Sequence, residues 1–253
     1  FLRRLDLAHR QSETAPTAIV VNYPSNPTAQ VVGLDFYKEI VAFAERRDLL
    51  ILSDLAYSEI YFDGVPPPSM LQVPGAMART IEFNSLSKTY AMPGWRMGFA
   101  AGNARLVNAL GRIKSYLDYG AFTPIQVAAT AALNGPQQCI DDIRAIYKAR
   151  RDVLVDAMTR AGWDVPSPPA SMFAWAPIPE PFQALGSLAF SKLLIELAKV
   201  VVLFGIVFCD YVVVYVFLEL VENEHRIRQA ARNLKKFLSQ ASEIVGRAQE
   251  AAQ

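Results

Sequence analysis

Short apolar runs and helical apolar patterns alternate along the first half of the chain. Residues 18–23 (AIVVNY) are a β-branched run that ends at turn-forming residues, and residues 49–52 (LLIL) are a continuous apolar run, as in strands buried on both faces. Between them, residues 34–47 place apolar side chains at helical spacing. A third strand is expected over residues 80–84. This order predicts an α/β domain with a mostly parallel sheet.

The second half of the chain has a different order of elements. From about Arg105 the pattern is helical, and residues 136–161 are predicted as one long amphipathic helix. The elements expected after it are a strand over residues 171–176, a helix over residues 188–198 and a last helix from residue 222 to about residue 245. We therefore expect two domains, residues 1–135 and residues 136–253, with the long helix leading into the second.

The segment 200–218 is unusually apolar, with Asp210 as its single charged residue. By hydropathy alone, a run of this length is a candidate transmembrane helix. However, Gly205, Asp210 and Tyr211 lie within it, and an ionisable group at mid-membrane is costly. Its many β-branched residues suit strands instead. We expect two buried strands joined by a turn and no membrane span, with the transmembrane helix as the alternative.

Composition and charge exclude several classes of protein. A hydrophobic fraction of 52% with 19% charged residues rules out a largely disordered chain. The net charge of +1 gives no electrostatic reason to expect nucleic acid or an acidic membrane as partner. Two cysteines and two histidines form no metal-ligand pattern, so we expect no metal and a reducing compartment, the cytoplasm. The chain starts at Phe1 without a signal sequence, and we expect this to be an interior point of a longer protein.

Polar side chains follow each of the three predicted parallel strands. Asn26 lies just beyond the first strand, Asp54 ends the second, and Ser85 and Lys88 follow the third. Taken singly, each is explained by a turn, a loop or a solvated lysine. Because ligands of open α/β sheets bind at the carboxyl ends of the strands, their joint placement predicts one ligand site.

Three ordered motifs carry a resemblance to a known family. Residues 85–98 (SLSKTYAMPGWRMG) resemble the cofactor-lysine signature of the class I/II aminotransferases, which are fold type I pyridoxal phosphate enzymes. Residues 26–28 (NPT) and 53–57 (SDLAY) resemble the two preceding motifs of that family, in the same order. Residues 23–30 and 113–120 resemble bacterial alanine (glutamate–pyruvate) aminotransferases in particular. The similarity covers most of the chain, from about residue 20 to residue 238.

The resemblance implies a fold and a set of domains. Residues 1–135 would be the C-terminal part of the large pyridoxal 5'-phosphate-binding domain, an incomplete α/β domain with a mostly parallel sheet. Residues 136–253 would be the long connecting helix and a C-terminal α+β small domain. A homodimer is also implied, because active sites of the family lie at the subunit interface.

The resemblance also implies roles for individual residues. Lys88 would hold the cofactor as a Schiff base and, once released by the substrate, carry the proton of the reaction. Asp54 would pair with the pyridine nitrogen and keep it protonated, so that the ring is an electron sink. Tyr57 and Asn26 would donate hydrogen bonds to the phenolic oxygen of the cofactor.

The same resemblance assigns the phosphate to Ser85 and Arg96, a short donor and a planar guanidinium. Two departures from the family pattern accompany it. The family's N-terminal portion, with a phosphate loop and an aromatic residue stacked on the cofactor, is missing. In addition, Phe217 stands where the family has the arginine that binds the substrate carboxylate, and a phenyl ring cannot form that bidentate pair. Substrate contacts are therefore expected at Asn26 and, without a charge, at Phe217.

The reaction expected is transfer of an amino group between L-alanine or L-glutamate and a 2-oxo acid. The alternatives are a diaminopimelate or aromatic aminotransferase, or a non-catalytic remnant that binds pyridoxal phosphate without turnover. A membrane-associated protein anchored by residues 200–218 is a third. Amino acids and 2-oxo acids are the partners expected beside a second copy of the chain.

Overall fold

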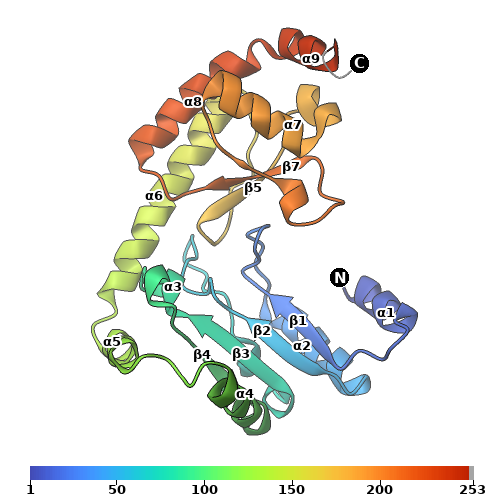
Figure 1. Cartoon of the computed structure of the whole chain (residues 1–253), viewed down its shortest axis with the longest axis vertical. Helices are drawn as coiled ribbons and strands as arrows, with labels where there is room; N and C mark the ends of the chain where they lie inside the picture. The colour runs from blue at the N-terminus through green and yellow to red at the C-terminus, as the bar shows by residue number, and fades with distance from the viewer. Residues whose placement is uncertain (251–253) are drawn as a thin grey trace. The chain divides into compact units, whose positions relative to one another are not determined.

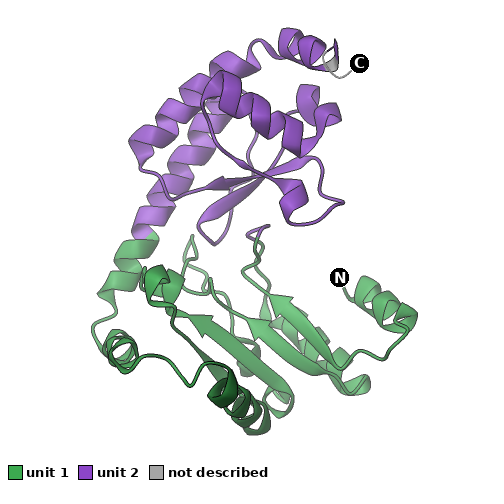
Figure 2. Ribbon diagram, viewed as in Figure 1, with its two compact units in different colours: residues 1–26, 30–144 green, residues 27–29, 145–253 purple. Residues whose placement is uncertain are grey.

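The computed structural model describes residues 1–250, which divide into two compact units (Figures 1 and 2). Unit 1 consists of residues 1–26 and 30–144, and unit 2 consists of residues 27–29 and the chain from residue 145 onward. The division falls inside the long helix α6 (Gln138–Ala161). The domains expected at residues 1–135 and 136–253 stay a prediction, and the last three residues of the second lie outside the described range.

Unit 1 is built on a four-stranded sheet with the order β1-β2-β3-β4 (Figure 1). Its strands are β1 (Ala18–Asn22), β2 (Leu50–Asp54), β3 (Thr80–Ser85) and β4 (Gly98–Gly102). The first three run parallel, and β4 is antiparallel to β3. The expected mostly parallel sheet is confirmed. In the described structure, the unit's other helices are α1 (Leu2–Gln11), α2 (Leu34–Arg46), α3 (Leu86–Thr89), α4 (Ala104–Leu117) and α5 (Thr123–Asn134).

Helix α2 forms where residues at helical spacing are apolar, and it buries that stripe in the core of unit 1. Ile40 and Ala44 are fully buried there, in one cluster with Ile51 of β2 and Val21 of β1. The strand residues alternate, so that Val20 points to the opposite side and is 70% exposed. The core of this unit therefore lies on the α2 side of the parallel strands.

Glu82 is a buried carboxylate that joins β3 to a neighbouring turn. It is 3% exposed, and its oxygens accept hydrogen bonds from Ser69 Oγ (2.7 Å), the Met70 amide (2.9 Å) and Ser53 Oγ (3.2 Å). A buried polar group is tolerated when its hydrogen bonds are made, as they are here. Glu82 thus fixes the turn Met70–Gln72 against the strands.

Replacing Glu82 with leucine should lower the free energy of unfolding by about 2–4 kcal/mol, because buried donors lose their acceptor. Glu82→Gln, which keeps one acceptor oxygen, should fall between leucine and the wild type. The matched control is Glu39→Leu, at an exposed position of α2, expected within about 0.5 kcal/mol of the wild type. Urea denaturation of the intact chain measures all three, and equal midpoints for Glu82→Leu and Glu39→Leu would contradict the prediction.

Unit 2 is an α+β unit with a three-stranded antiparallel sheet of order β5-β7-β6. Its strands are β5 (Phe173–Pro177), β6 (Leu203–Phe204) and β7 (Tyr215–Glu219). Beside the C-terminal part of α6, its helices are α7 (Gly186–Leu193), continued by a π-helical turn at Leu194–Ala198, then α8 (Glu224–Leu238) and α9 (Ala241–Glu250). Among the described residues, no helix is both long and apolar enough to cross a membrane. The segment 200–218 instead contains β6 and most of β7, so two strands form as expected, but only β7 is buried, since Leu203 of β6 is 40% exposed.

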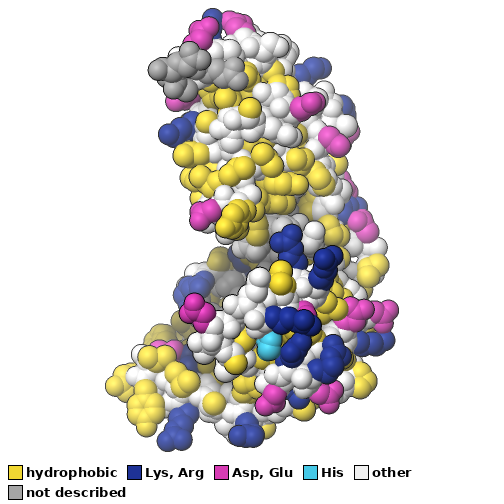
Figure 3. All heavy atoms as spheres, turned by 90° about the vertical axis from the view of Figure 1, so that its right-hand side faces the viewer, with side chains coloured by type: hydrophobic (Ala, Val, Ile, Leu, Met, Phe, Trp, Pro, Cys, Tyr) yellow, Lys and Arg dark blue, Asp and Glu magenta, His cyan; other side chains and the backbone are white. Residues whose placement is uncertain are grey.

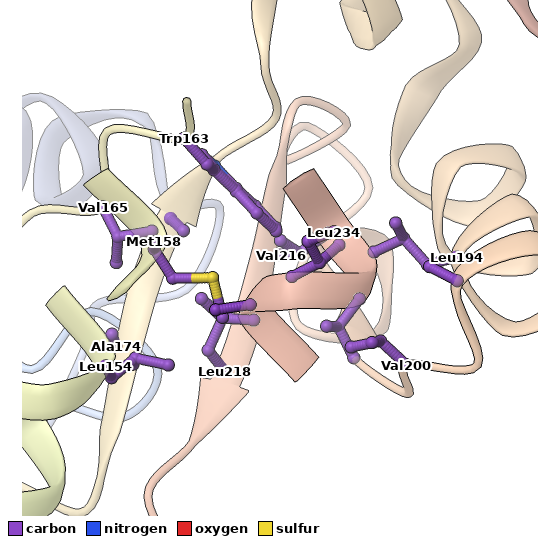
Figure 4. Close-up of a cluster of buried hydrophobic side chains, with 14 of the residues drawn as sticks. Leu154, Met158, Trp163, Val165, Ala174, Leu194, Val200, Val216, Leu218 and Leu234 are labelled. Carbon is purple, nitrogen blue, oxygen red and sulfur yellow. The ribbon is translucent and has the colours of Figure 1, made fainter. Parts of the chain in front are cut away.

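The core of unit 2 lies on one face of this sheet (Figure 4). Val216 and Leu218 of β7 meet Leu154 and Met158 of α6 and Leu234 of α8, and all five are buried. The residues that alternate with these along the strands point to the other face of the sheet, and many of them are aromatic. The sheet is thus apolar on both faces.

The last helix differs from the expectation of one helix over residues 222–245. It is two helices, α8 and α9, separated at Ser239 and Gln240. The Gln240 amide bonds the Phe237 carbonyl at 3.1 Å, and Ser239 Oγ bonds the Lys236 carbonyl at 2.8 Å. These i→i−3 bonds tighten the last turn of α8, and a serine that bonds its own backbone favours such an end.

Candidate functional site

The register of the parallel strands brings the ends of β1 and β2 together. Asn22 is paired with Asp54, so the last residues of the two strands lie side by side. Asn22 Nδ2 donates to the Asp54 carbonyl at 3.3 Å, and Asn22 Oδ1 accepts from the Asn26 amide at 2.8 Å. Asn22 therefore holds the turn that carries Asn26 against the end of β2. Asn22 was not predicted as a site residue, because an amide at the last position of a strand does not reveal which loop it will bond.

Asp54 and Tyr57 form the middle of the site. The Asp54 side chain is half-buried, and its Oδ1 accepts a hydrogen bond from the Ala56 amide at 3.1 Å. Removal from water raises the pKa of Tyr57, and the nearby Asp54 charge raises it further, while a hydrogen bond from Asn26 acts against both. Tyr57 therefore keeps its phenolic proton at neutral pH and can donate it in a hydrogen bond.

Lys88 joins this group from the third strand. Ser85, the last residue of β3, is the N-cap of α3, and its Oγ accepts from the Ser87 amide at 3.2 Å. The short helix then presents Lys88, whose Nζ lies 5.7 Å from the centroid of the Tyr57 ring. The structure thus brings together Asn26, Asp54, Tyr57 and Lys88, from three separate segments of the chain.

Arg96, another predicted cofactor-binding residue, lies at the end of an exposed turn. It follows the 3₁₀ turn Pro93–Trp95, is exposed, and has a left-handed backbone with φ of 52°. Its Nη1 donates to the Pro93 carbonyl at 3.0 Å. Positive φ in a residue with a side chain is uncommon and concentrates at functional sites. No described contact joins Arg96 to Ser85 or Lys88.

Phe217 belongs to unit 2 and sits in an aromatic cluster. It is 6% exposed, and its ring centroid lies 4.4 Å from that of Phe173 and 5.4 Å from that of Phe208. Trp175 stacks on Tyr215 on the same face of the sheet, with centroids 5.5 Å apart. The rings around Phe217 and its cross-strand partner Leu203 offer no charge to a carboxylate.

The donors near Lys88 have the chemistry that pyridoxal phosphate needs. An amine can bind its aldehyde carbon, a carboxylate can pair with its ring nitrogen, and a phenol with an amide can donate to its phenolic oxygen. Lys88, Asp54, Tyr57 and Asn26 provide these four groups. Ser85 has an O–H to donate while its oxygen caps α3, and the Arg96 guanidinium is a second group suited to phosphate.

Known proteins with a similar sequence are aminotransferases. The sequence model of the family "Aminotransferase class I and II" matches residues 3–209. AatC of Rhizobium meliloti (strain 1021) is 65% identical over 245 residues, which are 97% of this chain and 60% of AatC. Glutamate-pyruvate aminotransferase AlaC of Escherichia coli (strain K12) is 54% identical over 93% of this chain and 57% of its own length. An LL-diaminopimelate aminotransferase of Moorella thermoacetica is 41% identical over 92% of this chain and 60% of its own.

A solved structure of an aminotransferase has a fold similar to that of this chain. The crystal structure of an aromatic aminotransferase from Pyrococcus horikoshii OT3 has a TM-score of 0.86 at 26% identity, over 94% of this chain and 64% of that one. The chain thus spans about 60% of the length of the curated relatives it matches. The chain belongs to the class I and II aminotransferases, with the α/β architecture of fold type I pyridoxal phosphate enzymes.

Proposed function

We propose that this chain carries the cofactor-binding residues of a pyridoxal 5'-phosphate-dependent aminotransferase acting on L-alanine or L-glutamate and a 2-oxo acid. The observation that carries the proposal is the convergence of the Lys88 amine, the Tyr57 ring and the Asp54 carboxylate at the ends of the parallel strands. The 54% identical relative named as a glutamate-pyruvate aminotransferase supports this choice of substrate. A homodimer and a cytoplasmic location remain predictions.

Each residue of the site would have one task. Bound pyridoxal phosphate supplies an electron sink that lets an amino group leave one carbon skeleton and join another. Lys88 Nζ would bind the aldehyde carbon and later move the proton at the substrate Cα. Asp54 would keep the ring nitrogen protonated. Tyr57 and Asn26 would donate hydrogen bonds to the phenolic oxygen, and Ser85 and Arg96 would bind the phosphate.

A second substrate class also has support. Relatives named as LL-diaminopimelate aminotransferases are 41% identical over most of this chain, and a solved aromatic aminotransferase shares its fold. Specificity of either kind would depend on side chains around the substrate rather than on Lys88 itself. Comparing L-alanine, L-glutamate, LL-diaminopimelate and L-phenylalanine as donors separates the candidates.

Borohydride reduction in the presence of pyridoxal phosphate tests the cofactor site directly. We expect the cofactor to be fixed on Lys88, as read from the mass of the peptide that contains it. Lys88→Arg keeps the charge but should abolish this modification and any amino transfer. The matched control is Lys114→Arg, at an exposed lysine of unit 1, which should leave both unchanged. Modification that is spread evenly over the surface lysines, without a preference for Lys88, would contradict the proposal.

Phe217 generates a prediction about the substrate. Binding of an amino-acid carboxylate should be weak, because a phenyl ring stands where the family resemblance places a guanidinium. Phe217→Arg should raise kcat/KM for L-alanine about 10- to 100-fold, as a charge-assisted pair of about 1.5–3 kcal/mol requires. Phe217→Leu, which adds no charge, is the control and should give no gain.

The readout is the rate at which pyruvate forms from L-alanine. Cofactor fixation at Lys88, measured on the same samples, shows that unit 1 still folds, and urea denaturation of each variant checks the folding of unit 2. A gain that is equal for leucine and arginine would contradict a role for charge at this position. A non-catalytic remnant predicts fixation at Lys88 with no pyruvate from either variant.

A further inference from the structure

A depression on the surface of unit 2 lies between helices α6 and α8. Its volume is about 220 Å³. Three of the residues that line it are alanines, Ala157, Ala161 and Ala231, which are buried or partly buried. Because their side chains are short, the space between the two helices stays open. A space of this size is smaller than the pockets that hold drug-sized ligands, so it suits a compact ligand.

Four cationic side chains line the same depression. Arg228, Arg232 and Lys235 lie on one face of α8, because four and three residues separate them along the helix. Arg160 lines the depression from α6. Among the lining residues that the structure describes, Asp156 is the single carboxylate. Positive charges from two helices therefore converge on one space.

The single carboxylate already has a partner on its own helix. Arg160 Nε donates to Asp156 Oδ1 at 2.9 Å, and Arg160 Nη2 bonds the second oxygen. Arg232 donates to the neutral amide oxygen of a glutamine. Within the part of the chain that the structure describes, no carboxylate forms an ion pair with Arg228, Arg232 or Lys235. Three positive charges thus surround the depression without a negative partner.

Helix stability alone does not explain this arrangement of charges. Lys235 lies in the last turn of α8, where a cation complements the helix dipole. Arg228 lies near the start of the helix, where the dipole offers no such gain. Arg228 and Arg232 are four residues apart, and like charges at this spacing destabilise a helix. A bound anion would remove that repulsion.

A second group of basic side chains differs in this respect. On the face drawn in Figure 3, Lys and Arg side chains gather over unit 1, on the side where Figure 1 places α1. There, Asp6 of α1 pairs with Arg10 at 2.8 Å and with Arg47 at 2.7 Å. Part of the positive charge of that group is therefore neutralised within the protein. The depression between α6 and α8 has the stronger need of an anion.

We propose that this depression binds a compact phosphate anion, either free or as the phosphate group of a small organic ester. Such a group carries between about 1.5 and 2 negative charges at neutral pH, which the three cations without a carboxylate partner can balance. Arg228 and Arg232 would bind its oxygens through paired N–H donors, and Lys235 would add a point charge.

Phosphorus NMR titration of the intact chain tests this proposal, with inorganic phosphate and glycerol phosphate as the two probes. We expect saturable binding, and the probe that binds more tightly distinguishes a free ion from an ester. The double substitution Arg228→Gln and Arg232→Gln should weaken binding at least about tenfold, because two guanidinium donors are lost. Ala157→Leu keeps every charge but fills the depression, so it should weaken binding as well.

The matched control is the double substitution Arg226→Gln and Lys236→Gln. Both residues are exposed on α8 and neither lines the depression, so the same charge is removed from the same helix. We expect this pair to change the affinity less than about twofold, because exposed charges outside the site are screened by salt. Arg96→Gln, at the candidate cofactor site, should leave binding in the depression intact.

Three outcomes would overturn the proposal. The first is that neither probe gives a saturable signal. The second is an equal loss of binding in the control pair, since the attraction would then come from general surface charge. The third is that Arg96→Gln abolishes binding while the Arg228 and Arg232 pair does not, because the phosphate would then lie at the cofactor site. Urea denaturation of each variant separates a loss of binding from a loss of folding.

Discussion

The parallel alignment of β1, β2 and β3 is the constraint on which the candidate site depends. Parallel strands end at one edge of the sheet, so residues that follow three different strands meet there. The register pairs Asn22 with Asp54, and Asp54 with Phe83, two residues before Ser85. A shift of one residue in this register would turn Asp54 to the opposite face. The buried alternation of Ile19, Val21 and Ile51 against α2 prevents such a shift, so the core sets the site geometry.

Much of unit 1 could be predicted from the sequence. Its parallel strands are short apolar runs and α2 is a longer apolar pattern at helical spacing, and turn residues bound them. Because the strand ends could be predicted, the placement of Asp54 at the end of β2 and of Lys88 just after β3 could be predicted as well. Asn22 could not be identified in this way, because its role depends on a hydrogen bond to a loop that only the fold brings near. The left-handed backbone of Arg96 was equally hidden, since no glycine marks it.

Unit 2 was predicted less completely, for physical reasons. The β-branched residues of the segment 200–218 indicated two strands and a turn rather than a membrane helix, and the structure has β6 and most of β7 there. The break between α8 and α9 was not predicted, because Ser239 and Gln240 are ordinary helix residues and only their local hydrogen bonds end α8. Short polar interruptions of this kind leave the hydrophobic period almost unchanged.

The aromatic cluster around Phe217 explains why a ring is stable at this position. Phe217 buries its ring against Phe173 and Phe208, so the residue contributes to stability by apolar packing. An arginine there would lose this packing but could pair with a carboxylate. The sheet pairing of β5 with β7 is made by backbone groups, so it does not by itself require a particular side chain at position 217. The strand pairing of unit 2 therefore does not determine which side chain stands at position 217, and the role proposed for this position must be tested by substitution.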